Sequence, residues 1–319
     1  MTALFLTSLE SVALLLLMAI PGFICAKLKM LNHAEAVKFL SVTLLYIQQP
    51  FVTVNSFLNT EFNSGILLNM LAVFLFTAVT ELLVLGIGIG ITKAIKPLDV
   101  DSKGIISYGG AFGNLGYMCI PFLQLLAPGQ HELILYASCA VVVFNLLGWT
   151  IGNYVITGDK KYMSIKKAIF NPPTLAFIIA MPLFVCNINF ARFNLDGIAN
   201  IFRLFADAVG PLSMTLLGIK LAEMSLKDIF LDYRTYIASG IKLIIYPIVG
   251  FLIILLMTTF MDVSDIKLNL VALSAMPVAN NCMMFASMAN KDTSLAAKEV
   301  MISTILSCVT IPLCIMIML

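Results

Sequence analysis

The sequence has little charge for its length. Of its 319 residues, 11% are charged (19 basic and 17 acidic) and 61% are hydrophobic. Soluble domains carry about 25% charged residues, and a globule of this size needs more polar surface than this chain can supply. This deficit excludes a water-soluble enzyme and a disordered protein, and the net charge of +2 excludes a basic surface for nucleic acid. The composition indicates an all-α polytopic membrane protein, because a chain in lipid must satisfy its own backbone hydrogen bonds.

Residues that build metal and disulfide sites are also scarce or scattered. The seven cysteines form no CxxC pair and no cluster with histidine, and the two histidines, His33 and His131, are isolated from each other. We therefore expect free cysteines, no metal site and no cofactor. The sequence also contains no HExxH motif and no paired-aspartate or serine–lysine arrangement at membrane depth, so we do not expect an enzyme.

Long apolar runs dominate what remains, and they predict ten transmembrane helices. Each run is continuous rather than alternating, which argues against a β-barrel, and each is about as long as a membrane helix must be. The first run lacks a basic leader and a cleavage site, so we expect it to be a membrane helix. The predicted helices cover residues 5–26, 34–58, 64–93, 103–126, 130–157, 169–188, 196–222, 233–260, 266–290 and 294–318.

Lysine and arginine are divided unequally between the loops. The loops after odd-numbered helices contain 14 of them, against two (Arg192 and Lys267) after even-numbered helices. By the positive-inside rule, the odd-numbered loops are cytoplasmic and both termini lie outside. The 14 are Lys27, Lys29, Lys38, Lys93, Lys96, Lys103, Lys160, Lys161, Lys166, Lys167, Lys227, Arg234, Lys291 and Lys298. We call the predicted cytoplasmic side the lysine-rich face.

The longest lysine-rich loop, residues 158–168, divides the chain into two parts. Residues 1–157 and 169–319 each contain five predicted helices. An odd number of helices per half forces the halves into opposite orientations, which is the condition for an inverted repeat.

Two predicted helices are interrupted near their middle. Residues 107–121 contain four glycines, Asn114 and Pro121, and residues 274–282 contain Pro277, Asn280 and Asn281. Glycine and proline weaken a helix, and the freed backbone groups must face protein or a wet cavity. Matched interruptions in two halves indicate a transporter's binding site, where half-helix N-termini suit a carboxylate.

At these residues the chain resembles the auxin efflux carrier family, which includes plant PIN exporters and bacterial malate or malonate permeases. Residues 113–121 (GNLGYMCIP) resemble the family's fourth helix and residues 275–277 (AMP) its ninth. Residues 171–174 (NPPT) resemble the Asn-Pro motif that opens helix six, and residues 207–211 with Gly218 resemble the seventh helix. One difference stands out: PIN exporters have proline where this chain has Gly113.

The resemblance implies two inverted five-helix repeats with helices four and nine crossing. Helices 1, 2, 6 and 7 would form a scaffold, and helices 3–5 and 8–10 would form a mobile domain that moves like an elevator. Asn114 matches the crossover asparagine near the substrate carboxylate, and Pro277 matches the crossover proline. Asn145 and Thr53 match looser positions in helices five and two. The whole candidate substrate site comprises Gln49, Thr53, Gly113, Asn114, Gly116, Tyr117, Asn145, Pro277, Asn280 and Asn281.

Four charged residues, Glu81, Arg203, Asp207 and Lys242, lie well away from the ends of predicted helices, where a charge costs about 2.5–3.5 kcal/mol. Arg203 and Asp207 are four residues apart and can form a pair. Glu81 and Lys242 lie at similar predicted depths, so we expect them to approach each other. For both pairs, a structural salt bridge and a coupling or gating role remain open. Two alternatives also remain for Gln48 and Gln49: they either line the substrate path or bond a carbonyl freed by Pro50.

The sequence therefore predicts a secondary transporter of a small organic anion in the plasma membrane. The anion is an auxin-like monocarboxylate or a malate-like dicarboxylate. A sodium-coupled bile-acid-like carrier and a channel are the alternatives. A coupling proton and a second copy of the chain in a homodimer are open options as partners, and no nucleic acid is expected.

Overall fold

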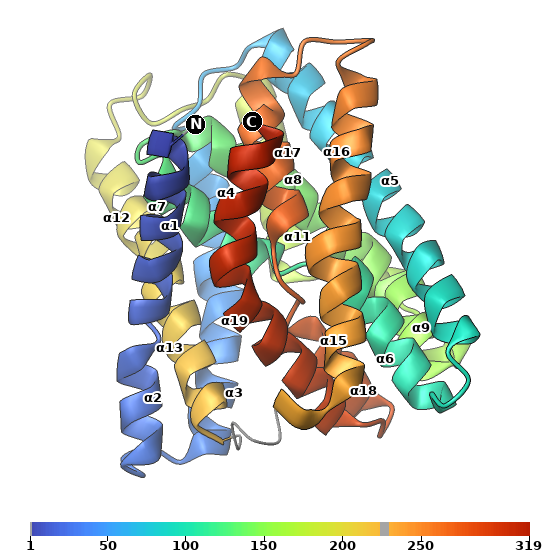
Figure 1. Cartoon of the computed structure of the whole chain (residues 1–319). Helices are drawn as coiled ribbons and strands as arrows, with labels where there is room; N and C mark the ends of the chain where they lie inside the picture. The colour runs from blue at the N-terminus through green and yellow to red at the C-terminus, as the bar shows by residue number, and fades with distance from the viewer. Residues whose placement is uncertain (1, 224–229) are drawn as a thin grey trace.

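The computed structural model describes residues 2–223 and 230–319, and every regular element in these residues is helical (Figure 1). The first half contains α1 (Thr2–Leu17), α2 (Ile20–Lys27), α3 (His33–Thr43), η1 (Leu44–Gln48), α4 (Gln49–Leu58), α5 (Ser64–Ala94), α6 (Val100–Ala111), η2 (Leu115–Cys119), α7 (Ile120–Leu126), α8 (His131–Leu147), η3 (Gly148–Gly152) and α9 (Asn153–Thr157). The linker contains η4 (Lys160–Tyr162) and α10 (Ile165–Ile169). The second half contains α11 (Pro172–Val185), α12 (Asp196–Asp207), α13 (Val209–Glu223), α15 (Tyr233–Gly240), η5 (Ile241–Ile245), α16 (Tyr246–Met257), α17 (Ser264–Ala275), α18 (Asn281–Met288) and α19 (Thr293–Met318).

Eight helical segments within the described residues are long and apolar enough to cross a membrane. They are Leu4–Lys27, His33–Leu58, Ser64–Ala94, His131–Thr157, Lys160–Val185, Asp196–Glu223, Tyr233–Met257 and Thr293–Met318. Most of their ends lie within three residues of the predicted ones; the start of the helix predicted at 169–188 differs by nine. The predicted helices at 103–126 and 266–290 are the two exceptions, because each is broken into two shorter helices. The all-helical membrane fold is therefore confirmed.

Acidic and polar caps mark several helix starts at the lysine-rich face. The side chains of Asp99, Asp232 and Asp292 accept hydrogen bonds from backbone N–H groups in the first turns of α6, α15 and α19. Asn171 does the same for α11, where Pro172 and Pro173 follow it, as the Asn-Pro motif predicts. Lys227, one of the 14 loop residues counted above, lies outside the described residues.

Three π-helical turns share one cause. Segments η1, η2 and η5 each end two residues before a proline, which is Pro50, Pro121 or Pro247. Proline has no N–H, and its ring clashes with the carbonyl four residues earlier, so the turn before it widens. These widened turns leave carbonyl groups without an intrahelical donor.

Helices of the predicted scaffold pack closely against one another. Segment α2 packs against α13, and α4 against α11 and α12. Gly22 and Gly218 permit the first contact: a Cβ at Gly218 would overlap the carbonyl oxygen of Ala19, and one at Gly22 would overlap that of Thr215. Small residues at such contacts are typical of membrane helix packing.

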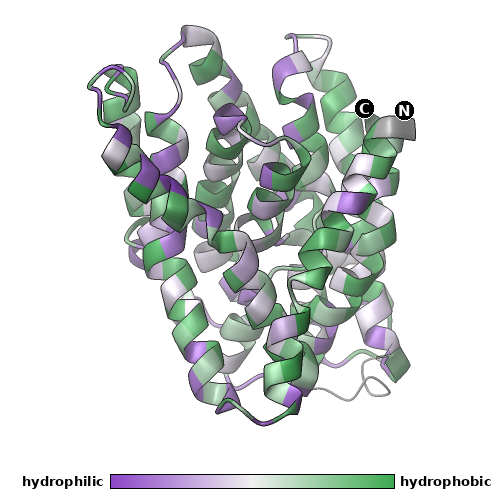
Figure 2. Ribbon diagram, turned by 90° about the vertical axis from the view of Figure 1, so that its left-hand side faces the viewer, coloured by the Kyte–Doolittle hydropathy of each residue, from purple (hydrophilic) through white to green (hydrophobic). Residues whose placement is uncertain are grey.

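A second group of packed helices contains both broken helices. Segment α6 lies against α5, α9, α15 and α19, and α19 lies against α17 and α18. Both termini lie at the same end of the bundle (Figure 1), as an even number of crossings requires. Hydrophobic residues cover the long outer helices, and hydrophilic residues gather toward the ends of the bundle and at points between the helices (Figure 2).

Candidate functional site

The two broken helices cross in the interior through paired extended backbone. The N–H of Asn114 donates to the carbonyl of Pro277 at 2.8 Å, and the N–H of Ala279 donates to the carbonyl of Phe112 at 3.0 Å. Gly113 and Val278 thus form an antiparallel bridge. Because each break supplies partners to the other, non-helical backbone is tolerated at this depth.

Beyond the crossing, each of the two extended segments continues into a helix, η2 in the first half and α18 in the second. Asn114 precedes η2, and its Oδ1 accepts from the N–H of Tyr117 at 3.3 Å. Asn280 precedes α18 without a side-chain cap. The backbone N–H groups of Gly116, Asn280 and Asn281 have no acceptor among residues 2–223 and 230–319. Free N–H groups at two helix N-termini form a site of partial positive charge suited to an anion.

A cavity of about 40 Å³ lies beside these groups, which is room for a few water molecules. Eight of the ten residues predicted from the sequence line it: Gln49, Gly113, Asn114, Gly116, Tyr117, Asn145, Asn280 and Asn281. The Oδ1 atom of Asn280 is buried there without a hydrogen-bond donor among the described residues. Pro277 contributes through its carbonyl bond to Asn114, whereas Thr53 is buried but does not line the cavity.

Two hydrogen bonds join the predicted scaffold to η2 beside this cavity. Gln49 Nε2 donates to the carbonyl of Gly116 at 2.8 Å, and Ser213 Oγ donates to the carbonyl of Tyr117 at 2.9 Å. Both carbonyls lie in the turn that Pro121 widens, so the scaffold caps groups that the proline frees. Gln49 thus lines the cavity and also bonds a freed carbonyl. That carbonyl belongs to Gly116 and lies in the turn before Pro121, whereas the sequence suggested one freed by Pro50. Ser213 was missed, since a serine in an apolar helix carries no distinctive pattern.

Two glycines, Gly109 in α6 and Gly113 in the break that follows it, make room for two buried charged groups. A Cβ at Gly113 would lie 2.9 Å from the ammonium of Lys242, and one at Gly109 would lie 2.5 Å from Oε2 of Glu299. Glu299 is fully buried and was missed, because its position near the start of α19 next to Lys298 resembles a loop edge. The absence of a side chain at Gly113 therefore lets the Lys242 ammonium reach the crossover.

Glu81 and Lys242 are both fully buried, but they do not form an ion pair within 4.0 Å in the described residues. The Lys242 ammonium instead lies 3.2 Å from the ring centroid of Tyr246, which is a favourable cation–π position. The salt-bridge alternative is thus not seen in this conformation, but α5 packs against η5 and α16, and the two groups are close enough to act on each other electrostatically.

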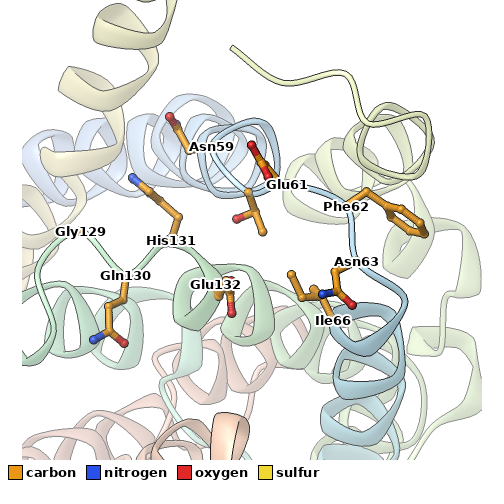
Figure 3. Close-up of a pocket in the computed structure, with 10 residues that line it drawn as sticks. Asn59, Glu61, Phe62, Asn63, Ile66, Gly129, Gln130, His131 and Glu132 are labelled. Atoms are coloured by element: carbon orange, nitrogen blue, oxygen red, sulfur yellow. The ribbon is translucent and has the colours of Figure 1, made fainter. Parts of the chain in front are cut away.

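Arg203 and Asp207 pair as predicted, with Nη1 and Oδ2 3.6 Å apart, but their position differs from the expected one. Their side chains are 56% and 57% exposed, because they line an open cavity of about 350 Å³ that also includes Asn55 and His131. A neighbouring cavity of about 630 Å³ contains Glu61 and Glu132 (Figure 3). Both cavities lie at the lysine-poor end, away from the crossover.

Comparison with known proteins gives two findings. A family model described as "membrane transport protein" matches residues 7–165 and 161–315. The chain is also 25% identical over 226 residues to an "uncharacterized transporter" of Methanothermobacter thermautotrophicus, covering 68% of this chain and 69% of that protein. The chain therefore belongs to the membrane transport protein family, which is the family of auxin efflux carriers and PIN-like transporters.

Proposed function

We propose that this protein is a secondary transporter of a small organic anion and that it binds the anion's carboxylate at the crossover. The observation that carries this proposal is the convergence of three free N–H groups on one cavity. Two come from α18 and its preceding residue and one from η2, so both repeats contribute. The amides of Asn114, Asn145 and Asn280 supply further donors and acceptors around the same cavity.

An elevator movement is supported by how few polar contacts hold the two helix groups together at the site. Gln49 and Ser213 belong to predicted scaffold helices, and Gly116 and Tyr117 belong to the predicted mobile domain. Each contact is a single side-chain hydrogen bond, worth about 0.6 kcal/mol on average between membrane helices. Such bonds can break and re-form during each transport cycle.

We propose ten membrane crossings, with both termini outside the plasma membrane and the lysine-rich face in the cytoplasm. The eight continuous segments and the two broken helices give this number. The two matches of one family model, over residues 7–165 and 161–315, support a division into two repeats at the linker. Because each repeat would contain five helices, an odd number, the two repeats would be inverted relative to each other.

Glu81 and Lys242 are proposed to support coupling rather than to contact substrate. Both are fully buried and neither lines the cavity, and the Lys242 ammonium lies beside Gly113 at the crossover. Transport by Glu81→Gln measured across pH tests this role. An unchanged rate and an unchanged pH profile would exclude it.

A thermal-shift screen of the purified protein tests the proposed site. The ligands are malonate, malate and indole acetate, each with and without sodium. We expect stabilisation by at least one carboxylate, loss of this stabilisation in Asn114→Ala, and full retention in Asn32→Ala, an exposed asparagine before α3. A carboxylate that stabilises Asn114→Ala as well as the parent protein would place the site elsewhere.

A further inference from the structure

Glu299 is a buried acid that the proposed substrate site does not use. It lies on α19, seven residues after the capping residue Asp292 and thus about 10 Å into the helix. Its side chain is fully buried, and both carboxyl oxygens lack a hydrogen-bond donor among the described residues. An ionised carboxylate in such a place would be costly, since nothing compensates for the lost hydration.

The crossover encloses Glu299 closely. The missing side chain of Gly109 on α6 makes room for Oε2, and the side chain of Val278 approaches the same point. One turn further along α19, Ser303 Oγ accepts from the N–H of Val278 at 3.1 Å. Any movement of the crossover strands therefore changes the surroundings of Glu299.

A bound proton explains the burial better than a metal ion does. Among residues 2–223 and 230–319, no three His, Cys, Asp or Glu side chains are placed to hold a metal ion. On α18, the Cys282 thiol is close enough to Glu299 to interact with it electrostatically. The Lys242 ammonium of η5 lies instead beside Gly113. A neutral, protonated carboxyl needs no counter-charge.

An ion cluster at the lysine-rich face lies within electrostatic range of Glu299. Asp232 and Arg234 at the start of α15, together with Asp292, are the charged groups close enough to act on Glu299 electrostatically. Arg234 bonds Asp232 at 2.7 Å and lies 3.6 Å from Asp292, and Lys298 reaches Asp232 at 3.4 Å. These side chains are between 10% and 38% exposed, so the cluster reaches the surface.

We propose that Glu299 is a proton-binding site of the mobile domain, which holds a proton in this conformation and exchanges it with the lysine-rich side when the crossover rearranges. The proton passes from the carboxyl group to water at the Asp232–Arg234–Asp292 cluster and returns by the same route. The purpose of this exchange, coupling to anion transport, rests on the proposed function; the site itself does not.

Infrared spectroscopy of the purified protein in lipid nanodiscs tests the site without any transport measurement. Protonated carboxyl groups absorb separately from carboxylates, and their band shifts in D₂O. At neutral pH we expect Glu299→Gln to lose one protonated-carboxyl component, Glu299→Asp to retain a shifted component, and the exposed Glu35→Gln to retain all of them. An unchanged protonated-carboxyl band in Glu299→Gln would overturn the proposal. If Glu299→Gln does not fold, a protonated-carboxyl band in Glu299→Asp identical to that of the parent protein would overturn the proposal instead.

Measurements of proton exchange and of carboxylate transport distinguish the proton-binding role of Glu299 from the proposed transport function. We expect Asp232→Asn to slow the D₂O shift of the Glu299 component, because it alters the cluster on the exchange route. Malonate uptake by parent and Glu299→Gln proteoliposomes is then compared across pH, and we expect Glu299→Gln to lose the pH dependence. A Glu299 band in a protein that transports no carboxylate would refute the proposed function alone. Carboxylate transport with the same pH dependence in Glu299→Gln would refute the coupling role alone.

Discussion

Removal of the Ser213 hydroxyl tests whether the crossover is held to the scaffold by breakable bonds. Ser213→Ala deletes the 2.9 Å bond to the carbonyl of Tyr117, for which the Gly210 carbonyl of the same helix competes at 3.1 Å, and leaves the Gln49 bond to Gly116 in place. Hydrogen bonds between membrane helices are worth about 0.6 kcal/mol on average and about 1.7 kcal/mol at most. At 1.4 kcal/mol per tenfold change, the population of the present conformation should fall about 3-fold to about 20-fold relative to its alternative. Ser213→Ala combined with Gln49→Ala should shift it further.

Double electron–electron resonance between two spin labels gives distance distributions that report this population directly. Labels at Gly197→Cys on α12 and Phe260→Cys after α16 report the two helix groups, in a background without the seven native cysteines. A Cβ at Gly197 meets no atom within 4 Å, and Phe260 is 82% exposed, so neither label should disturb packing. Ser8→Ala, which deletes only a local bond within α1, is the control. An identical distance distribution in Ser213→Ala and the Ser8→Ala control would refute the reasoning.

Three further predictions follow from close contacts and from the ion cluster. Gly113→Ala forces Lys242 away from the crossover and should abolish transport with the fold intact, whereas Gly240→Ala, with open space around its Cβ, should transport normally in the same uptake assay. Gly218→Ala should lower the free energy of unfolding by more than about 2 kcal/mol, because its Cβ overlaps the backbone of Ala19, just before α2, and of Phe23 in α2 rather than a movable side chain. Thermal unfolding compared with Gly86→Ala, whose Cβ meets nothing within 4 Å, measures this effect. Hydrogen bonds from Arg234 hold the pKa of Asp232 below its usual range. The stabilisation that this pair gives the fold is therefore fully present above the ordinary aspartate pKa of about 3.9, and it is lost as pH falls through the lower pKa of the folded state. Arg234→Ala should therefore flatten the acid side of the stability profile, and an unchanged profile would contradict the assignment.

Much of the fold could be predicted because lipid leaves few choices for an apolar run. The ends of the helix predicted at 64–93 differ from those of α5 by at most one residue, since charged residues and Asn63 bound the run sharply. The breaks at residues 112–114 and 276–280 were also predictable, because glycine, proline and asparagine concentrate there. The start of the membrane segment Lys160–Val185, predicted at 169, was less accurate, because η4 and the linker helix α10 precede α11 with only short bends between them.

The site could be predicted only where its residues interrupt a helix. Asn114, Asn280 and Asn281 stand out from apolar surroundings, and all three line the cavity. Ser213 acts through a carbonyl freed on another helix by Pro121, and no pattern local to α13 records that contact. Glu299 depends on the notch at Gly109, 190 positions earlier in the chain. Arg203 and Asp207 were placed too deep, because depth counted along a helix does not reveal an adjoining open cavity.

Counterflow in proteoliposomes tests the central claim that the crossover binds and carries a small carboxylate. Vesicles preloaded with unlabelled malonate, or with whichever carboxylate stabilises the protein in the thermal-shift screen, are diluted into the labelled compound. We predict saturable accumulation that is lost in Asn114→Ala and retained in Asn32→Ala. Flux that does not saturate, or accumulation that is equal in Asn114→Ala and the parent protein, would contradict the account.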